Sequence, residues 1–202
     1  MTFDEVWAKA QVLGHLPYDD GRLLWDCAAI AAKRHPKLPF LEIGSFQGKS
    51  TILLAHHAPV VMIEPSWLWE SGSNDGLSLN NYRYSAREFD ARSHDALLLN
   101  TNNLPFRCEL IQAPSRDVEF ASFKFSSFGS NFALIFVDGD HTEGGVDVDC
   151  AKFLRLLATG GIACFHDYTL PEYPVVVTSV NAFTPNWYTL AKAGSLLAKV
   201  KP

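Results

Sequence analysis

The chain has 202 residues, 48% of them hydrophobic and 19% charged, with a formal net charge of −5 at pH 7. This composition predicts one globular domain over residues 1–202 and argues against a disordered chain. The acidic balance argues against a nucleic-acid partner, because phosphate contacts need clustered Lys and Arg, and it leaves a small molecule as the expected partner.

The N-terminal residues 1–36 are predicted to be helical, with a break near Gly14 and Pro17. In the second half, "GRLLWDCAAIAAKR", apolar residues recur at helical spacing and define one apolar face. This face is a candidate contact for a homo-oligomer.

The sequence also predicts where the protein resides. Its N-terminus carries acids and no long apolar core, so we expect no signal peptide. No apolar run approaches the length of about 20 residues that spans a bilayer. The four cysteines are scattered, without a CxxC pair, and are expected to be reduced. These features predict a cytoplasmic protein with no membrane partner.

Short apolar runs then alternate with helical patterns along the chain. The predicted strands cover residues 39–44, 60–64, 108–112, 132–138 and 161–167. Helices are predicted over 48–57 and 144–161, the second ending at the pair Gly160–Gly161. Near-continuous apolar strands separated by helices predict an α/β fold of the Rossmann-like, doubly wound kind, with a mostly parallel sheet.

Two further segments complete this prediction. Residues 187–200 alternate apolar and polar residues around Gly194–Ser195, which predicts a C-terminal antiparallel hairpin and a seven-stranded sheet. Residues 65–95 are irregular and rich in aromatic side chains, which predicts a lid or substrate loop.

Each predicted parallel strand ends in a polar side chain. The strand-end residues are Glu42, Glu64, Gln112, Asp138 and the pair His166–Asp167. Open α/β sheets bind ligands at the carboxyl ends of their strands. The sequence therefore predicts one polar crevice at this edge.

The loop "LEIGSFQGKS" joins the first strand to its helix. Gly44 and Gly48 permit tight turns, and the helix start offers N–H groups to an anion. Glu64 follows about 20 residues later, where an acid can accept hydrogen bonds from ribose hydroxyls. The glycine spacing is neither G-x-G-x-x-G nor that of a phosphate-binding loop. Together these features predict a nucleoside-bearing ligand.

Two longer stretches carry a family resemblance. "FLEIGSFQGKSTILLA" and "FVDGDHTEGGVDVDCAKFLRLLATGGIACFHDY" resemble motifs of class I S-adenosylmethionine-dependent methyltransferases. The second resembles the branch that includes macrolide-sugar O-methyltransferases and the cephalosporin-biosynthesis proteins. The resemblance runs from about residue 40 to residue 201. It implies S-adenosylmethionine as cofactor and O-methylation of a small-molecule acceptor.

The resemblance also implies cofactor-binding roles. Gly44 would face the methionine part, Glu42 its amino group and Ser50 its carboxylate, while Glu64 would hold the ribose and Ser115 would lie near the adenine. The full implied set is Glu42, Gly44, Ser45, Gly48, Ser50, Glu64, Ser115 and Asp138.

Many O-methyltransferases of this branch use a divalent metal. By position, the resemblance implies Asp138, His166 and Asp167 as metal ligands, and His141 with Asp138 as catalytic residues, His141 being the general base. The family usually has two carboxylates, or a carboxylate and an amide, where this chain has His166 and Asp167. Two carboxylates and an imidazole suit Mg²⁺ less well than a softer divalent ion. A capping or hydrogen-bonding role for these histidines, and catalysis without metal, stay open.

Two other functions are kept as alternatives. Tyr188 and Lys192 spell the Y-x-x-x-K pattern of NAD(P)-dependent oxidoreductases, but they fall in a stretch of period-two alternation. A protein that binds S-adenosylmethionine without turnover is the other alternative, because His166 departs from the family pattern. The residues do not choose an acceptor among sugars, phenols and peptides.

Overall fold

The computed structural model describes residues 1–10, 12, 14–65, 92–118 and 131–202. The strands of its sheet are β1 Phe40–Ile43, β2 Val60–Ile63, β3 Cys108–Ile111, β4 Phe132–Val137, β5 Leu157–Phe165, β6 Tyr188–Ala193 and β7 Leu196–Val200. The α-helices are α1 Phe3–Lys9, α2 Tyr18–Arg34, α3 Lys49–Leu54, α4 Arg92–Thr101, α5 Glu143–Phe153 and α6 Pro174–Phe183. Two short 3-10 helices are η3 Ser115–Asp117 and η5 Leu154–Leu156.

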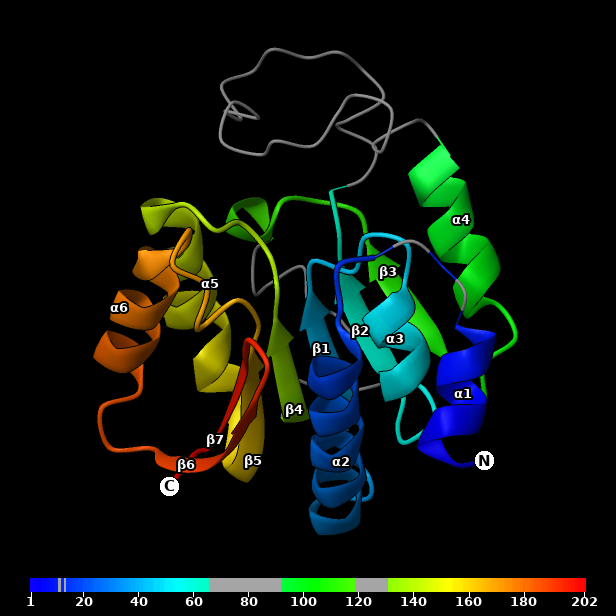
Figure 1. Ribbon diagram of the computed structural model, residues 1–202, viewed down its shortest axis with the longest axis horizontal. Coiled ribbons are helices and arrows are strands. Elements are labelled where there is room, and N and C mark those ends of the chain that lie inside the picture. Colours follow the sequence, from blue (N-terminus) through cyan, green and yellow to red (C-terminus); the bar gives the residue numbers. More distant parts are fainter. Residues whose placement is uncertain (11, 13, 66–91, 119–130) are drawn as a thin grey trace.

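The seven strands form one sheet in the order β3-β2-β1-β4-β5-β7-β6 (Figure 1). Strands β1 to β5 pair in parallel, and β7 pairs antiparallel with both β5 and β6. The predicted fold class and C-terminal hairpin are therefore confirmed. The predicted N-terminal helices are also present, with the break between α1 and α2.

Helices cover both faces of the sheet, which gives three layers. In Figure 1, α2 and α3 lie in front of the central strands, and α5 and α6 lie at the left. Alternate residues of a strand face opposite sides. In β1, Phe40 packs in the core beside α2 and α3, and Leu41 packs in the core beside α5 and α6. This burial on both faces explains why the strands are continuously apolar.

The glycine pair after α5 has a different role from the predicted helix stop. Helix α5 ends at Phe153, and β5 already begins at Leu157, so Gly160 and Gly161 lie inside a strand. The register between β4 and β5 shifts there. Gly160 has φ +76°, and a Cβ on Gly161 would lie 2.8 Å from the Ala158 carbonyl oxygen. The pair therefore forms a bulge rather than a cap.

Two helices, α4 and α6, were not predicted from the sequence. The predicted lid, residues 65–95, lies largely outside the described residues. Tyr188 and Lys192 lie in β6, so the Y-x-x-x-K pattern does not form a helical turn. None of the described helices is long and apolar enough to cross a membrane. All four cysteines are free.

Candidate functional site

The parallel register brings the strand ends together. Ile43 pairs with both Ile63 and Val137, Ile63 pairs with Ile111, and Val137 pairs with Phe165. The polar residues that follow these strands therefore share one edge of the sheet, as the sequence predicted.

The turn after β1 is in close backbone contact with the residue that follows β4. The Gly44 amide donates to the Ile63 carbonyl, and the Asp138 amide donates to the Ile43 carbonyl. Gly44 has φ +85°, and a Cβ there would lie 1.9 Å from the Asp138 carbonyl oxygen. Only glycine fits both this backbone conformation and this approach. The turn after β1 and the tip of β4 are thus held as one unit.

Glu42 is fully buried beneath this turn. Its carboxyl oxygens accept hydrogen bonds from the hydroxyls of Ser50 and Thr51 in α3. Burial raises the pKa of Glu42 to about 7, against the lowering effect of these two hydrogen bonds. Gly48 precedes α3 with φ +88° and a Cβ position 3.1 Å from Leu97. Glu42 and Ser50, two of the predicted cofactor residues, therefore contact each other in this structure.

Glu64 follows β2 and is also buried. Its Oε2 accepts the Phe46 amide at 2.7 Å. Burial raises the pKa of Glu64 to about 7, with the amides of Phe46 and Ser45 acting in the opposite direction. Phe46 has φ +47°, a conformation that is strained for a non-glycine residue and common at functional sites. The buried Ser45 hydroxyl lies close enough to Glu42 to lower the pKa of that carboxyl, although it is not aligned as a hydrogen bond.

Ser115 begins η3, just after β3. Lys152 of α5 donates hydrogen bonds to the carbonyls of Ser115 and Arg116, at 2.9 and 2.7 Å. Asp149, one turn before the end of α5, is fully buried, and burial raises its pKa to about 7. Ser115 lies close enough to lower that pKa, although neither Asp149 oxygen has a hydrogen-bond partner within the described chain. Helix α5 thus fixes η3 and places Ser115 beside a buried acid.

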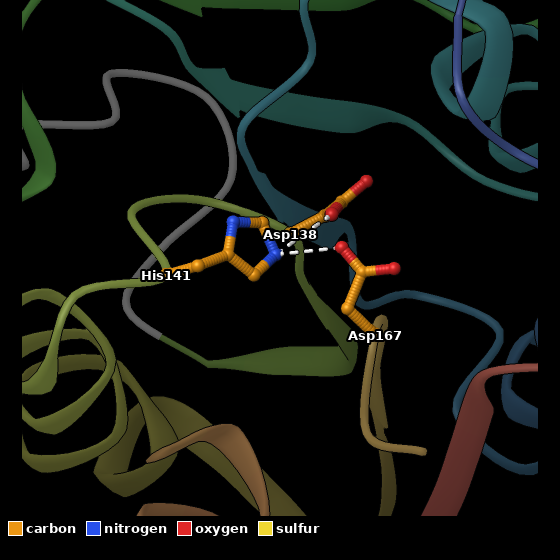
Figure 2. Close-up of side chains that lie close together, drawn as sticks. All are labelled: Asp138, His141 and Asp167. Carbon is orange, nitrogen blue, oxygen red and sulfur yellow. Dashed lines mark ion pairs between the residues drawn. The ribbon is translucent and has the colours of Figure 1, made fainter. Parts of the chain in front are cut away.

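Asp138, His141 and Asp167 converge beyond the tips of β4 and β5 (Figure 2). His141 Nε2 lies 2.9 Å from Asp167 Oδ2 and 3.7 Å from Asp138 Oδ1. One ligand atom from each residue lies within 4.8 Å of the others. Burial would lower the pKa of His141, but Asp167 and Asp138 outweigh burial and raise it.

Asp167 has an unusual backbone that serves this arrangement. Its φ is +56°, in the left-handed region that non-glycine residues rarely adopt. Burial opposes ionisation, but hydrogen bonds from His141 and His166 outweigh it and hold the pKa of Asp167 below its ordinary value. Asp167 is therefore an ionised carboxylate at neutral pH.

His166 lies behind these carboxylates. Its Nδ1 lies 3.1 Å from Asp138 Oδ1 and 3.3 Å from Asp167 Oδ1, and its Nε2 lies 3.2 Å from Asp20 Oδ2. Asp138 and its neighbours raise the pKa of His166 well above its ordinary value, although burial opposes them. Both ring nitrogens therefore face carboxylates. Of the two histidines near Asp138, His141 is the one whose side chain joins the group that could hold a metal ion.

Asp20 is a site residue that the sequence interpretation missed. It lies on α2 and is completely buried. The signal for it was present, because Asp20 shares the buried helical face of Leu24, Cys27 and Ala31. An acid on an apolar helix face needs a partner in the core.

The loop between Asp138 and α5 holds His141 in place. Asp140 Oδ1 accepts the Thr142 amide, and the Thr142 hydroxyl caps α5 by accepting the Gly145 amide. The Tyr173 ring lies 4.7 Å from the His141 ring, centroid to centroid. A small pocket between these loops and α6 is lined by both His141 and His166. Asp140 therefore acts as a turn residue.

The comparisons with known proteins agree with this geometry. The structure is similar to the O-methyltransferase NovP, with a TM-score of 0.64, 13% identity and coverage of 90% of this chain and 80% of that chain. It is similar to CalS11, a calicheamicin methyltransferase, with a TM-score of 0.61, 11% identity and coverage of 98% and 89%. An O-methyltransferase from Bacillus cereus in complex with SAH matches with a TM-score of 0.59, 20% identity and coverage of 98% and 90%.

A search of the curated proteins found no match. The family model described as "Methyltransferase domain" matches residues 41–168, more than half of the chain. The chain therefore belongs to this family, as a class I S-adenosylmethionine-dependent methyltransferase with the seven-stranded sheet that its motifs predicted. This membership excludes the oxidoreductase alternative.

Proposed function

We propose that this member of the methyltransferase family transfers a methyl group from S-adenosylmethionine to a hydroxyl of a small molecule. One observation carries the proposal: two sets of acids with different surroundings lie along the same sheet edge. Glu42 and Glu64 lie in the first set, and Asp138 and Asp167 lie in the second. The first set suits a nucleoside-bearing cofactor, and the second suits activation of an acceptor.

The cofactor would bind across the ends of β1, β2 and β3. Glu64 is a buried carboxyl with one oxygen engaged by the Phe46 amide, which leaves acceptor capacity for ribose hydroxyls. The buried Ser45 hydroxyl lies in the turn beside it. Gly44 and Asp138 hold this turn close to β4. We propose the complete cofactor set predicted from the sequence: Glu42, Gly44, Ser45, Gly48, Ser50, Glu64, Ser115 and Asp138.

A divalent metal fits the second set. Asp138, His141 and Asp167 offer two carboxylates and one imidazole within 4.8 Å of one another, which suits an ion such as Mn²⁺ better than Mg²⁺. We propose His141 as the third ligand in place of His166, because the His166 nitrogens face Asp20 and Asp138. A bound metal would supply Lewis-acid activation of an acceptor hydroxyl.

The alternative role proposed for His141 is that of general base, because an imidazole nitrogen that binds a metal cannot also accept a proton. Its imidazole contacts Asp167 and the Tyr173 ring and lines the small pocket beside α6. Methyl transfer from a sulfonium is a direct displacement, so orientation of the acceptor and removal of its proton are the tasks left to the protein. The two roles of His141 make different predictions: His141→Gln abolishes Mn²⁺ binding if the residue is a ligand and spares it if the residue is only a base.

Formation of S-adenosylhomocysteine tests the proposal. The protein would be incubated with S-adenosylmethionine and Mn²⁺ against a panel of sugar hydroxyls, phenols, amines and peptides. We expect product only with a hydroxyl acceptor, and loss of product with Asp138→Ala. Transfer to amines alone would overturn O-methylation. Cofactor binding without product from any acceptor would favour the alternative, a protein that binds S-adenosylmethionine without turnover.

A further inference from the structure

Asp20 is the innermost residue of the charged cluster. Its side chain is 0% exposed, and that of His166 is 2% exposed, while those of Asp138 and Asp167 are 24% and 14% exposed. The cluster thus extends from the core under α2 to the open edge of the sheet. Burying charged groups at the inner end costs free energy unless each has a partner.

The hairpin turn between β6 and β7 is shaped to receive Asp20. The Ser195 amide lies 3.1 and 3.2 Å from the two Asp20 carboxylate oxygens, and the Ser195 hydroxyl donates to Oδ2 at 2.6 Å. Gly194 has φ +53°, and a Cβ there would lie 1.7 Å from Asp20 Oδ1. The turn therefore accepts Asp20 only because residue 194 is glycine and residue 195 offers two donors.

The third contact of Asp20 leads to the site. Asp20 Oδ2 lies 3.2 Å from His166 Nε2, at ion-pair distance but without the alignment of a hydrogen bond. The opposite edge of the same ring contacts Asp138 and Asp167 through Nδ1. A rigid imidazole held on both edges fixes the positions of the two carboxylates that face His141.

We propose that Asp20 is a positioning residue that acts through His166 to orient Asp138 and Asp167 toward His141. The consequence for metal and acceptor rests on the proposed function, because it concerns the same site. Asp20 and Ser195 both lie outside residues 41–168, the segment that matches the family. Elements from the two ends of this chain would therefore complete a site built by its central part.

The test compares Asp20→Asn with Asp19→Asn, the same change at the exposed neighbouring position. Ring signals of histidine would be recorded by ¹H–¹⁵N NMR at one fixed pH, without metal, and assigned with His141→Gln and His166→Gln. We expect Asp20→Asn to shift the signals of both His166 and His141, although Asp20 contacts only the former. Asp19→Asn should shift neither. Folded Asp20→Asn protein with wild-type His141 signals would overturn the proposal.

A second variant covers the case in which Asp20→Asn does not fold. Ser195→Ala removes one hydrogen bond to Asp20 and keeps both charges, so we expect smaller shifts of the same signals. Unchanged signals in Ser195→Ala would then count against the proposal. In Asp20→Asn, affinity for S-adenosylhomocysteine should change less than affinity for Mn²⁺, because the substitution acts on the Asp138 side chain and leaves Glu64 and the Gly44 turn unchanged.

Calorimetry with Mn²⁺ separates this inference from the metal proposal. We expect Asp20→Asn to weaken Mn²⁺ binding about 10- to 100-fold, the range typical for residues that orient metal ligands. Equal Mn²⁺ affinity in wild type and Asp20→Asn would contradict the positioning role. Absence of Mn²⁺ binding in wild type would remove the proposed metal site, while the NMR comparison would still decide the role of Asp20.

Discussion

Two groups of acids lie at the same sheet edge, and their surroundings differ. Glu42 and Glu64 contact hydroxyls and amides, and burial raises the pKa of each to about 7. Asp138 and Asp167 contact histidines, and the pKa of Asp167 lies below its ordinary value. The fold supplies the positions of these acids, while burial raises the pKa of Glu42 and Glu64, and contacts with histidines lower that of Asp167.

The difference is the basis for proposing separate tasks for the two groups. A carboxyl that titrates near neutral pH can take up a ligand that donates hydrogen bonds to its ionised form. A carboxylate that stays ionised beside an imidazole suits a cation or an acceptor that must lose a proton. The Gly44 turn joins the two groups, because it contacts the Asp138 backbone.

Disrupting the contact between the Gly44 turn and the Asp138 backbone should produce the largest effect, a loss of stability. Gly44→Ala places a Cβ 1.9 Å from the Asp138 carbonyl oxygen at a φ of +85°, so we expect it to lower the free energy of unfolding by at least about 3 kcal/mol. Denaturant unfolding measures the change. Gly144→Ala is the matched control, because a Cβ at Gly144 meets no atom within 4 Å. Equal stability of the two variants would contradict the described contact.

Asp138→Ala should weaken Mn²⁺ binding more than it weakens binding of S-adenosylhomocysteine. It removes one carboxylate of the proposed metal set, so we expect Mn²⁺ affinity to fall at least about 100-fold. The change in affinity for S-adenosylhomocysteine should be smaller, because the turn contacts the Asp138 backbone rather than its side chain. Asp140→Asn is the control, since Asp140 serves the turn before α5. Calorimetry that finds equal Mn²⁺ losses in both variants would argue against Asp138 as a ligand.

The pKa of Glu64 predicts that affinity for S-adenosylhomocysteine depends on pH. In the proposed role, ribose hydroxyls donate hydrogen bonds to the ionised Glu64 carboxylate, and the fraction of this form increases as pH rises through about 7. Affinity for S-adenosylhomocysteine should therefore rise about tenfold between pH 6 and pH 8. Glu64→Gln should lose the larger part of this rise, whereas Glu42→Gln should keep that part, because Ser50 and Thr51 already bond the Glu42 oxygens. Identical pH profiles for wild type and Glu64→Gln would contradict the role of Glu64.

The smallest effect is expected at the cap of α5. Thr142→Ala removes the side-chain cap that accepts the Gly145 amide, so we expect a loss of stability of about 1 kcal/mol. Thermal unfolding measures it, with the exposed Thr178→Ala as control and an expected change within about 0.5 kcal/mol. A Thr142→Ala variant as stable as the control would show that Asp140 alone holds the loop.

The elements that position the site were predictable from the sequence. Apolar runs followed by an acid identified β2 and β4, which Glu64 and Asp138 follow, whereas the acid of β1, Glu42, lies inside the strand. The same logic failed for α6, whose "PVVVTSV" start has the β-branched composition of a strand. Its helix is stabilised by burial of Val176, Ser179 and Val180 on one face, which local propensity does not reveal.

The partners of the acids were less predictable. Asp138, His141 and Asp167 all lie in the stretch "FVDGDHTEGGVDVDCAKFLRLLATGGIACFHDY". They come together because β4 and β5 pair in parallel and end side by side. Asp20 is 146 residues before His166 in a different element, and only the packing of α2 brings the two together. The position of a strand end is a local property, whereas the residues around its acid can come from distant parts of the chain.

Titration calorimetry with S-adenosylhomocysteine, first with Mn²⁺ and then with EDTA, tests the central claim most directly. The two groups of acids predict micromolar binding of S-adenosylhomocysteine that persists in EDTA, and separate Mn²⁺ binding that requires Asp138. Absence of S-adenosylhomocysteine binding under both conditions would contradict the assignment of Glu42 and Glu64 to a cofactor site. Loss of that binding in EDTA would contradict the separation of the two groups.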